Sequence, residues 1–177
     1  MTEFKKVSGS LEIVRTACLA NQIFGQHFSQ FMPRPQIDYI LDSYNSFKTI
    51  NERINTGGYS YYFINSDNRQ VGFFAYCSRL GDTFEITEIG MIKKQRGKGN
   101  AKKALKFIRE QAEAAGQRTL KIKVDKKNET AVKAFTALGF EEIGEEQEKL
   151  SGDYFVEKAV LALSLEKHKD DEELADV

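Results

Sequence analysis

A short segment rich in glycine and basic residues has the residue types and spacing best suited to chemistry. It runs from Arg96 to Ala101, carries glycines at Gly97 and Gly99, and lies between an expected strand and an expected helix. Glycines at such a turn let main-chain N–H groups converge, and the first turn of a helix adds unbonded N–H groups and the positive end of its dipole. The segment therefore predicts an anion site, with phosphate as its natural ligand.

The charges around this segment agree with an anion site. Seven basic residues and no acidic ones lie between positions 93 and 106. Basic residues in the first turn of a helix oppose its dipole, and a bound polyanion would remove that conflict. Two common nucleotide motifs do not fit, because GxGxxG lacks its third glycine here and GxxxxGK[ST] is absent. A plain glycine-rich turn with a solvated basic face stays open as the alternative.

Length and composition limit the classes of protein to consider. The chain has 177 residues, of which 41% are hydrophobic, which suits one domain with a real core. Its 26 basic and 26 acidic residues give zero net charge, which argues against a surface built for nucleic acid. There is no apolar leader and no apolar run of about 20 residues, so we expect a cytoplasmic protein with no membrane partner. We expect Cys18 and Cys77 to be buried, and no Cys/His spacing predicts a metal site.

Hydrophobic periodicity predicts an α/β fold. The expected elements are a short strand ending at 7, a helix over 11–28 with Val14, Cys18 and Ile23 on its apolar stripe, helices from 35 and over 47–55, an antiparallel meander over 59–65, 71–77 and 83–92, a helix over 98–115, a strand over 119–124, a helix over 128–138, and a strand pair over 141–146 and 154–165. We expect residues 1–165 to form one domain and the charged residues 166–177 to be a disordered tail.

In order and spacing, these features resemble the GNAT superfamily of N-acetyltransferases. Arg96, Gly99 and Ala101 match its Arg/Gln-x-x-Gly-x-Gly/Ala signature. The resemblance covers about residues 71–165, and the helical start is loosely similar to polyamine-type acetyltransferases. Its further matching residues are Val124, Asn128, Ala131, Phe135, Leu138, Gly139, Phe140 and the run from Tyr154 to Lys158. It implies a single-domain, mixed and mainly antiparallel sheet flanked by helices, with a splay between the fourth and fifth strands.

The resemblance also implies acetyl-CoA as cosubstrate and no metal. The coenzyme A pyrophosphate would lie on the segment after the third meander strand, and the pantetheine arm would pair with that strand. An interior strand glycine often marks a bulge or a close approach, so we expect the splay at Gly90. The residues implied for cofactor binding are Gly90, Met91, Ile92, Arg96, Gly97, Lys98, Gly99, Asn100, Ala101, Lys102, Asn128 and Phe135.

The implied reaction is direct transfer of acetyl from the thioester to a primary amine, which a general base would assist. Glu85 and Glu88 are the candidate bases. They are three residues apart and point to opposite faces of a regular strand, so only one can face the cleft unless a bulge intervenes. Glu88 is preferred because it lies nearer the expected acetyl position. The tyrosine that usually acts as general acid in the family corresponds here to Phe135, which has no proton to give. Tyr154 is the candidate to take over the role of general acid.

Several interpretations of partner and activity stay open. The acceptor is a small amine, a polyamine or a peptide amine, and a homodimer is neither predicted nor excluded. Glutamates in the segment 141–148 could attract a cationic amine or could simply protect a solvated edge strand. Because Phe135 cannot act as a general acid, a second hypothesis stays open, in which the protein is a catalytically idle acetyl-CoA-binding sensor or regulatory module. Nucleic-acid binding through residues 93–106 is a third, which the zero net charge disfavours.

Overall fold

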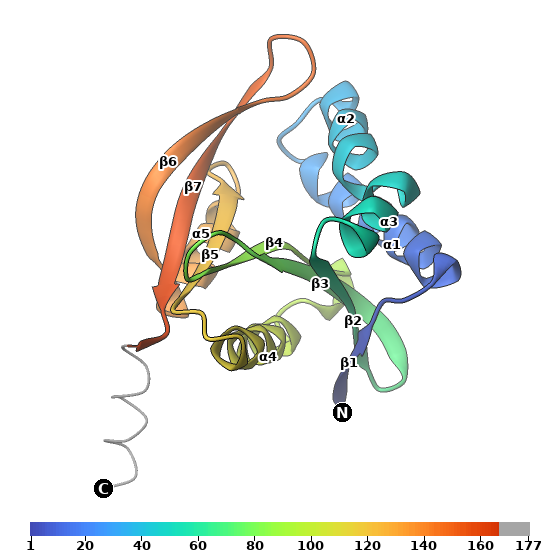
Figure 1. The fold of residues 1–177 in the computed structure, drawn as a ribbon. Coiled ribbons are helices and arrows are strands. Elements are labelled where there is room, and N and C mark those ends of the chain that lie inside the picture. Colours follow the sequence, from blue (N-terminus) through green and yellow to red (C-terminus); the bar gives the residue numbers. More distant parts are fainter. Residues whose placement is uncertain (167–177) are drawn as a thin grey trace, which may run out of the picture.

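The computed structural model describes residues 1–166 as a seven-stranded sheet with helices on both faces (Figure 1). The strands are ordered β1-β2-β3-β4-β5-β7-β6, and only the β4–β5 pair is parallel. The elements are β1 (Thr2–Lys6), α1 (Ser10–Phe28), α2 (Arg34–Asn45), α3 (Phe47–Asn55), β2 (Tyr59–Ser66), β3 (Arg69–Ser78), β4 (Thr83–Met91), η1 (Lys93–Gln95), α4 (Asn100–Ala114), β5 (Thr119–Asp125), α5 (Glu129–Ala137), β6 (Glu141–Lys149) and β7 (Phe155–Ser164). The predicted mixed, mainly antiparallel sheet is confirmed.

The two faces of the sheet carry separate apolar clusters. Phe73 and Phe74 are consecutive on β3, so their side chains point to opposite faces. Phe73 packs in the cluster under α1 and α3, whereas Phe74 packs in the larger cluster against α4. Because both side chains are fully buried, β3 is a central strand covered on both faces. This double cover fixes the strand next to it, β4, from which the site is built.

The fourth and fifth strands separate part of the way along. They pair from Thr83 to Ile86 on β4, and among residues 1–166 the rest of β4 pairs with β3 alone. A bulge at Thr87 marks the change, since the register with β3 moves from Ile86 to Glu88 across one step of the partner. The predicted splay is confirmed, but it begins after Ile86 and not at Gly90.

The presence of a glycine at position 90 is explained by its contact with a helix. A Cβ atom at this position would lie 3.1 Å from Ile23 Cγ2 and 3.3 Å from the ring of Phe24. Both neighbours belong to α1, so the glycine lets that helix approach the strand closely. Gly90 therefore satisfies the close-approach expectation for an interior strand glycine, whereas the bulge lies three residues earlier.

Helix α1 is rotated relative to the stripe expected for it. Cys18 is exposed and Val14 is 45% exposed, so both expectations of burial there were wrong. The buried residues of the helix are Ile13, Thr16, Leu19, Ala20 and Ile23. Thr16 can be buried because its hydroxyl donates to the Glu12 carbonyl at 2.8 Å, which satisfies it within the helix.

Two further expectations concern the C-terminal tail and membrane-spanning helices. The predicted tail lies outside the described residues except for Glu166. Within residues 1–166, no helix is long and apolar enough to cross a bilayer.

Candidate active site

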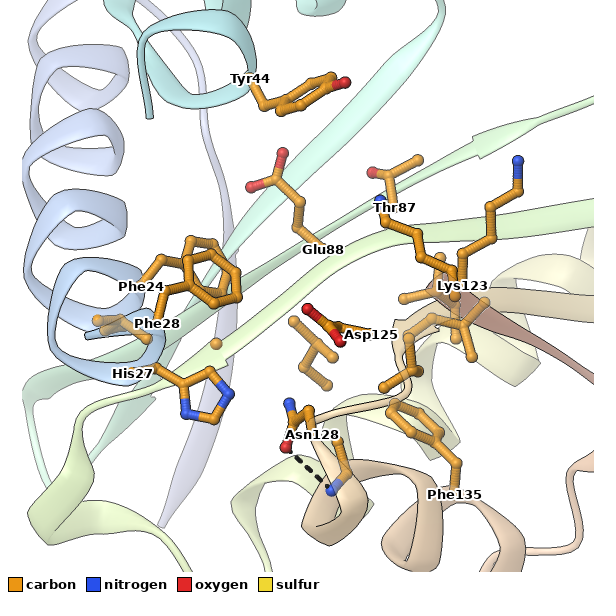
Figure 2. Close-up of a pocket in the computed structure, with 18 of the residues that line it drawn as sticks. Phe24, His27, Phe28, Tyr44, Thr87, Glu88, Lys123, Asp125, Asn128 and Phe135 are labelled. Carbon is orange, nitrogen blue, oxygen red and sulfur yellow. Dashed lines mark hydrogen bonds between the residues drawn. The ribbon is translucent and has the colours of Figure 1, made fainter. Parts of the chain in front are cut away.

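A cleft of about 1130 Å³ opens where β4 and β5 separate. Figure 2 shows its walls, with side chains from α1 and α2 facing others from β5 and α5 across the exposed edge of β4. The predicted residues that line it are Glu85, Glu88, Gly90, Met91, Arg96, Gly97, Gly99, Asn100, Ala101, Asn128 and Phe135. Among the predicted residues, Ile92, Lys98, Lys102 and Tyr154 are not part of the lining.

The turn into α4 presents a run of free main-chain donors to this cleft. Gly97 and Gly99 have φ angles of 75° and 78°, the left-handed region in which glycine carries no steric cost. The first helical bond of α4 runs from Lys103 N to Gly99 O at 3.1 Å. Among the described residues, the N–H groups at positions 97–102 have no main-chain or side-chain acceptor. Their number and position suit the oxygens of a pyrophosphate.

Two side chains of this turn are committed elsewhere. Arg96 Nε donates to the carbonyl of Met91 at 3.2 Å, which ties the turn to the end of β4. Asn100 is only 4% exposed, and its side-chain oxygen accepts from the hydroxyl of Thr2 on β1 at 2.9 Å. Lys103 Nζ also donates to that hydroxyl at 3.1 Å. Strand β1 therefore anchors the start of α4, a contact that local sequence patterns gave no means to find.

The bulge at Thr87 places both candidate bases on one face of the sheet. Glu85 lies opposite Cys77 and Glu88 opposite Ala75, and these partners are two residues apart on β3. The expectation for a regular strand, that only one glutamate faces the cleft, therefore does not apply, because the bulge brings both to the same side. The two differ in their ion pairs instead, since Glu85 Oε2 is 2.5 Å from Arg79 Nε and Glu88 Oε1 is 2.8 Å from Arg53 Nη1.

Glu88 is a buried carboxyl held by side chains from α2 and α3. Its side chain is 10% exposed, Oε1 accepts from Arg53, and Oε2 accepts from Asn45 Nδ2 at 2.5 Å. Burial raises the pKa of Glu88 to about 7, although the Arg53 charge and the hydrogen bonds act in the opposite direction. A carboxyl with this pKa exchanges its proton near neutral pH, as a general base requires.

Helices α2 and α3 supply site residues that the sequence did not predict. The Arg53 guanidinium lies 5.5 Å from the ring centroid of Tyr44 and 5.1 Å from that of Tyr59. The Tyr44 hydroxyl donates to Glu148, and burial together with that carboxylate keeps the pKa of Tyr44 well above its usual range. Tyr44 and Glu88 project into the same part of the cleft (Figure 2). No local motif marks these residues, because they meet only through the packing of α2 and α3 on β4.

Tyr154 is not brought to the cleft lining. It packs against the apolar cluster of Met32, Ile37, Leu41, Leu150 and Val156, and the Lys127 ammonium lies 5.7 Å from its ring. The tyrosines that do line the cleft include Tyr44 and Tyr59. The proposed substitute acid therefore loses its structural support.

Phe135 and Asn128 form the α5 wall of the cleft and also hold that helix. Helix α5 ends in a Schellman motif, with Phe140 N donating to Phe135 O at 3.1 Å and Gly139 N to Thr136 O at 3.0 Å. The Phe135 and Phe140 rings meet edge to face at 5.3 Å. The Asn128 side chain caps the helix by accepting from Ala131 N at 3.3 Å.

His27 also lines the cleft, although no motif in the sequence marks it. Both of its ring nitrogens are buried and have no hydrogen-bond partner among residues 1–166. Burial, followed by the charge of Arg96, lowers the pKa of His27, so the ring is neutral at physiological pH. Figure 2 shows it on α1, facing Asn128 across the cleft. In the same part of the chain, no group of three or more His, Cys, Asp or Glu residues could hold a metal ion.

Comparison with known proteins decides the family. Residues 34–152, more than half of the chain, match the family model described as acetyltransferase (GNAT) domain. The chain belongs to the GNAT acetyltransferase family. It is therefore an acyltransferase, and the free amides at the start of α4 lie where the family signature was recognised.

Solved structures support the same fold at low sequence identity. PaiA N-acetyltransferase from Thermoplasma acidophilum, in complex with coenzyme A, is 13% identical with a TM-score of 0.71, covering 90% of this chain and 98% of that one. A probable acetyltransferase from Staphylococcus epidermidis is 18% identical with a TM-score of 0.72, covering 93% and 99%. Spermidine/spermine N-acetyltransferase SpeG from Vibrio cholerae is 14% identical with a TM-score of 0.67, covering 96% of each chain. No curated protein matches the sequence of this chain.

Proposed function

We propose that this protein transfers an acetyl group from acetyl-CoA to a primary amine by direct attack, with Glu88 as the general base. One observation carries the proposal. The cleft opened by the separation of β4 and β5 is lined both by residues with free N–H groups, at positions 97 and 99–101, and by the buried carboxyl of Glu88. A donor site for a pyrophosphate and a base that titrates near neutrality are the two things the reaction needs.

The chain offers distinct groups to the parts of the cosubstrate. The N–H groups at 97–102 would hold the pyrophosphate, with Arg96 and Lys102 beside them. The edge of β4 around Met91, which has no partner in β5, would pair with the pantetheine arm. Asn128 and Phe135 would form the opposite wall. When bound, acetyl-CoA supplies the thioester carbonyl that the amine attacks.

Glu88 would remove the proton that the attacking amine must lose, directly or through a water molecule. A main-chain N–H on the free edge of β4 beside Met91 would donate to the oxygen that becomes negative. Glu85 is less suited to be the base, because its carboxylate is already held by Arg79 at 2.5 Å. No protein acid is required, since a thiolate is a fair leaving group and Phe135 has no proton to give.

The idle acetyl-CoA-binding module is the alternative that Phe135 favours, and a thiol-release assay separates the two. Wild-type protein with acetyl-CoA should release free thiol when amino acids, polyamines, aminoglycosides or peptide N-termini are added, and Glu88→Gln should not. Titration calorimetry with coenzyme A checks that the variant still binds the cosubstrate. Binding without turnover of any amine by the wild type would favour the idle module instead.

A further inference from the structure

His27 carries two buried polar atoms that the proposed function does not use. Neither Nδ1 nor Nε2 has a hydrogen-bond partner in the described part of the chain. Such atoms are rare in folded proteins, because a desolvated donor or acceptor without a partner destabilises the fold. Since His27 lines the cleft, a ligand in the cleft is well placed to supply the missing partner.

The position of His27 on α1 places it beside the free edge of β4. Ile23 and Phe24 are the helix residues that a Cβ atom at Gly90 would meet. Residues three and four apart share one face of a helix, so His27 extends that face by one turn. Figure 2 shows the ring facing Asn128 across the cleft. His27 therefore lies between α5 and the strand edge that we assign to the pantetheine arm.

The charge state of the ring indicates which part of the cosubstrate it suits. Burial, and then the positive charge of Arg96, lower the pKa of His27, while Asp125 acts more weakly in the opposite direction. A neutral imidazole has one donor nitrogen and one acceptor nitrogen. A phosphate offers acceptors and favours the protonated ring, whereas a secondary amide offers one N–H donor and one C=O acceptor. The neutral ring therefore matches an amide better than the pyrophosphate.

We infer that His27 binds the pantetheine arm of the cosubstrate, through a hydrogen bond between its ring and an amide of the arm. The inference rests on the proposed function, which assigns the arm to the free edge of β4. The torsion that turns a histidine ring is broad, so a nitrogen can turn toward the cleft at little cost. The amide would also satisfy a ring atom that the protein leaves unpaired. Helix α1 would thus hold the arm from the side opposite α5.

Two ligands that share a pyrophosphate test this inference by calorimetry. Coenzyme A carries the pantetheine arm, whereas adenosine diphosphate lacks it. His27→Phe removes both nitrogens and keeps an aromatic ring beside Phe28 and Phe31, whose ring centroids lie 5.6 and 5.2 Å from that of His27. We expect about tenfold weaker binding of coenzyme A, the loss of one hydrogen bond between neutral groups, and wild-type binding of adenosine diphosphate. Unchanged affinity for coenzyme A, or an equal loss for both ligands, would overturn the inference.

Stability separates a binding role from a structural one. Phenylalanine replaces two buried atoms that lack partners by apolar ones, so the urea midpoint of His27→Phe should not fall below that of the wild type. If the larger ring overpacks the site and the midpoint falls, His27→Leu repeats the two titrations with a smaller side chain. The loss should again be confined to coenzyme A, and a loss shared by both ligands would assign His27 a structural role.

Two further variants control the test. His27→Gln keeps a side-chain donor and acceptor, so its affinity for coenzyme A should stay within about threefold of the wild type. Gln117→Met removes another buried oxygen that has no partner within residues 1–166, at a position outside the cleft lining. It should bind both ligands as the wild type does. A loss in either variant as large as that in His27→Phe would contradict the inference.

The two proposals fail in different ways. If the wild type binds no coenzyme A, acetyl transfer is wrong, and the His27 inference falls with it. If the wild type binds coenzyme A and releases thiol, but His27→Phe binds coenzyme A equally well, acetyl transfer stands and only the role of His27 is wrong.

Discussion

The two ends of the cleft offer different kinds of groups to the ligands that we propose for them. At the cofactor end the donors are main-chain N–H groups at positions 97–102, fixed by glycines in the left-handed region. At the acceptor end they are charged side chains from α3, four strands and the loop before β4, arranged as ion pairs. The first arrangement depends on six consecutive residues, whereas the second depends on the whole tertiary fold. The contrast predicts which substitutions change binding of the cosubstrate and which change chemistry or acceptor choice.

The substitution Glu88→Gln should have the largest effect, and it tests whether chemistry can be lost without loss of cosubstrate binding. The amide keeps the shape of the side chain and cannot take a proton, so we expect kcat to fall about 10²–10⁴-fold, the usual contribution of a general base. Coenzyme A affinity should stay close to wild type, because Glu88 does not belong to the turn before α4. Thiol release measures the first effect and calorimetry the second.

Glu85→Gln is the matched control on the same strand face. It removes a carboxylate that is already held by Arg79, so its effect on kcat should be far smaller. A loss equal to or larger than that of Glu88→Gln would assign the base to Glu85.

At the cofactor end, Gly99→Ala should weaken coenzyme A binding about tenfold, since a left-handed conformation costs a non-glycine residue about 1–2 kcal/mol and the turn must shift. Gly116→Ala is the matched control. Gly116 has a φ of 71° against 78° for Gly99, and a Cβ at either position meets no atom within 4 Å. The two variants should lose similar unfolding free energy in urea, but only Gly99→Ala should lose affinity. Equal affinities would show that the turn does not hold the cosubstrate.

The pH dependence of the reaction tests the role of the buried Glu88 carboxyl as general base. Glu88 must lose its proton to act as a base, so kcat/KM should rise with pH and level off above its pKa of about 7. Arg53→Met removes the cation that favours the ionised form of Glu88. Its loss should raise the pKa of Glu88 and shift the pH profile to higher pH by about one unit. Arg53→Lys keeps the charge and should stay near the wild-type profile. A profile that does not move in Arg53→Met would show that Arg53 does not act through Glu88.

The smallest expected effect concerns the anchor between β1 and α4. Thr2→Val keeps the shape and removes the hydroxyl that Asn100 Oδ1 accepts from at 2.9 Å, which leaves a buried oxygen without that donor. We expect a loss of about 1 kcal/mol in unfolding free energy. Coenzyme A affinity should fall only a few-fold, because the glycines and not Thr2 aim the main-chain donors. A loss as large as that of Gly99→Ala would show that β1 controls the cofactor end.

The sequence was sufficient for the fold and for the position of the glycine turn before α4, because both depend on local patterns. Period changes marked the α-helices and most strands but not the short η1, and the two glycines with their basic neighbours marked the turn before α4. The bulge at Thr87 could not be predicted, since nothing in the residues of β4 shows how they pair with β3. That single bulge placed Glu85 on the same face as Glu88.

The acceptor end was missed for a related reason. Asn45 and Arg53 are ordinary polar residues in amphipathic helices until α2 and α3 pack against β4 and their side chains reach Glu88. The choice of Tyr154 failed in the same way, because a position on a hairpin does not show which side of the turn the ring will pack on. Contacts between residues far apart in the chain carry this information.

Calorimetric titration of the wild-type protein with coenzyme A, and separately with pantetheine, which lacks the pyrophosphate, tests the central claim most directly. If the free N–H groups before α4 hold the pyrophosphate, coenzyme A should bind at one saturable site per chain and much more tightly than pantetheine. No saturable heat from coenzyme A at millimolar concentration, or equal affinities for the two ligands, would contradict it.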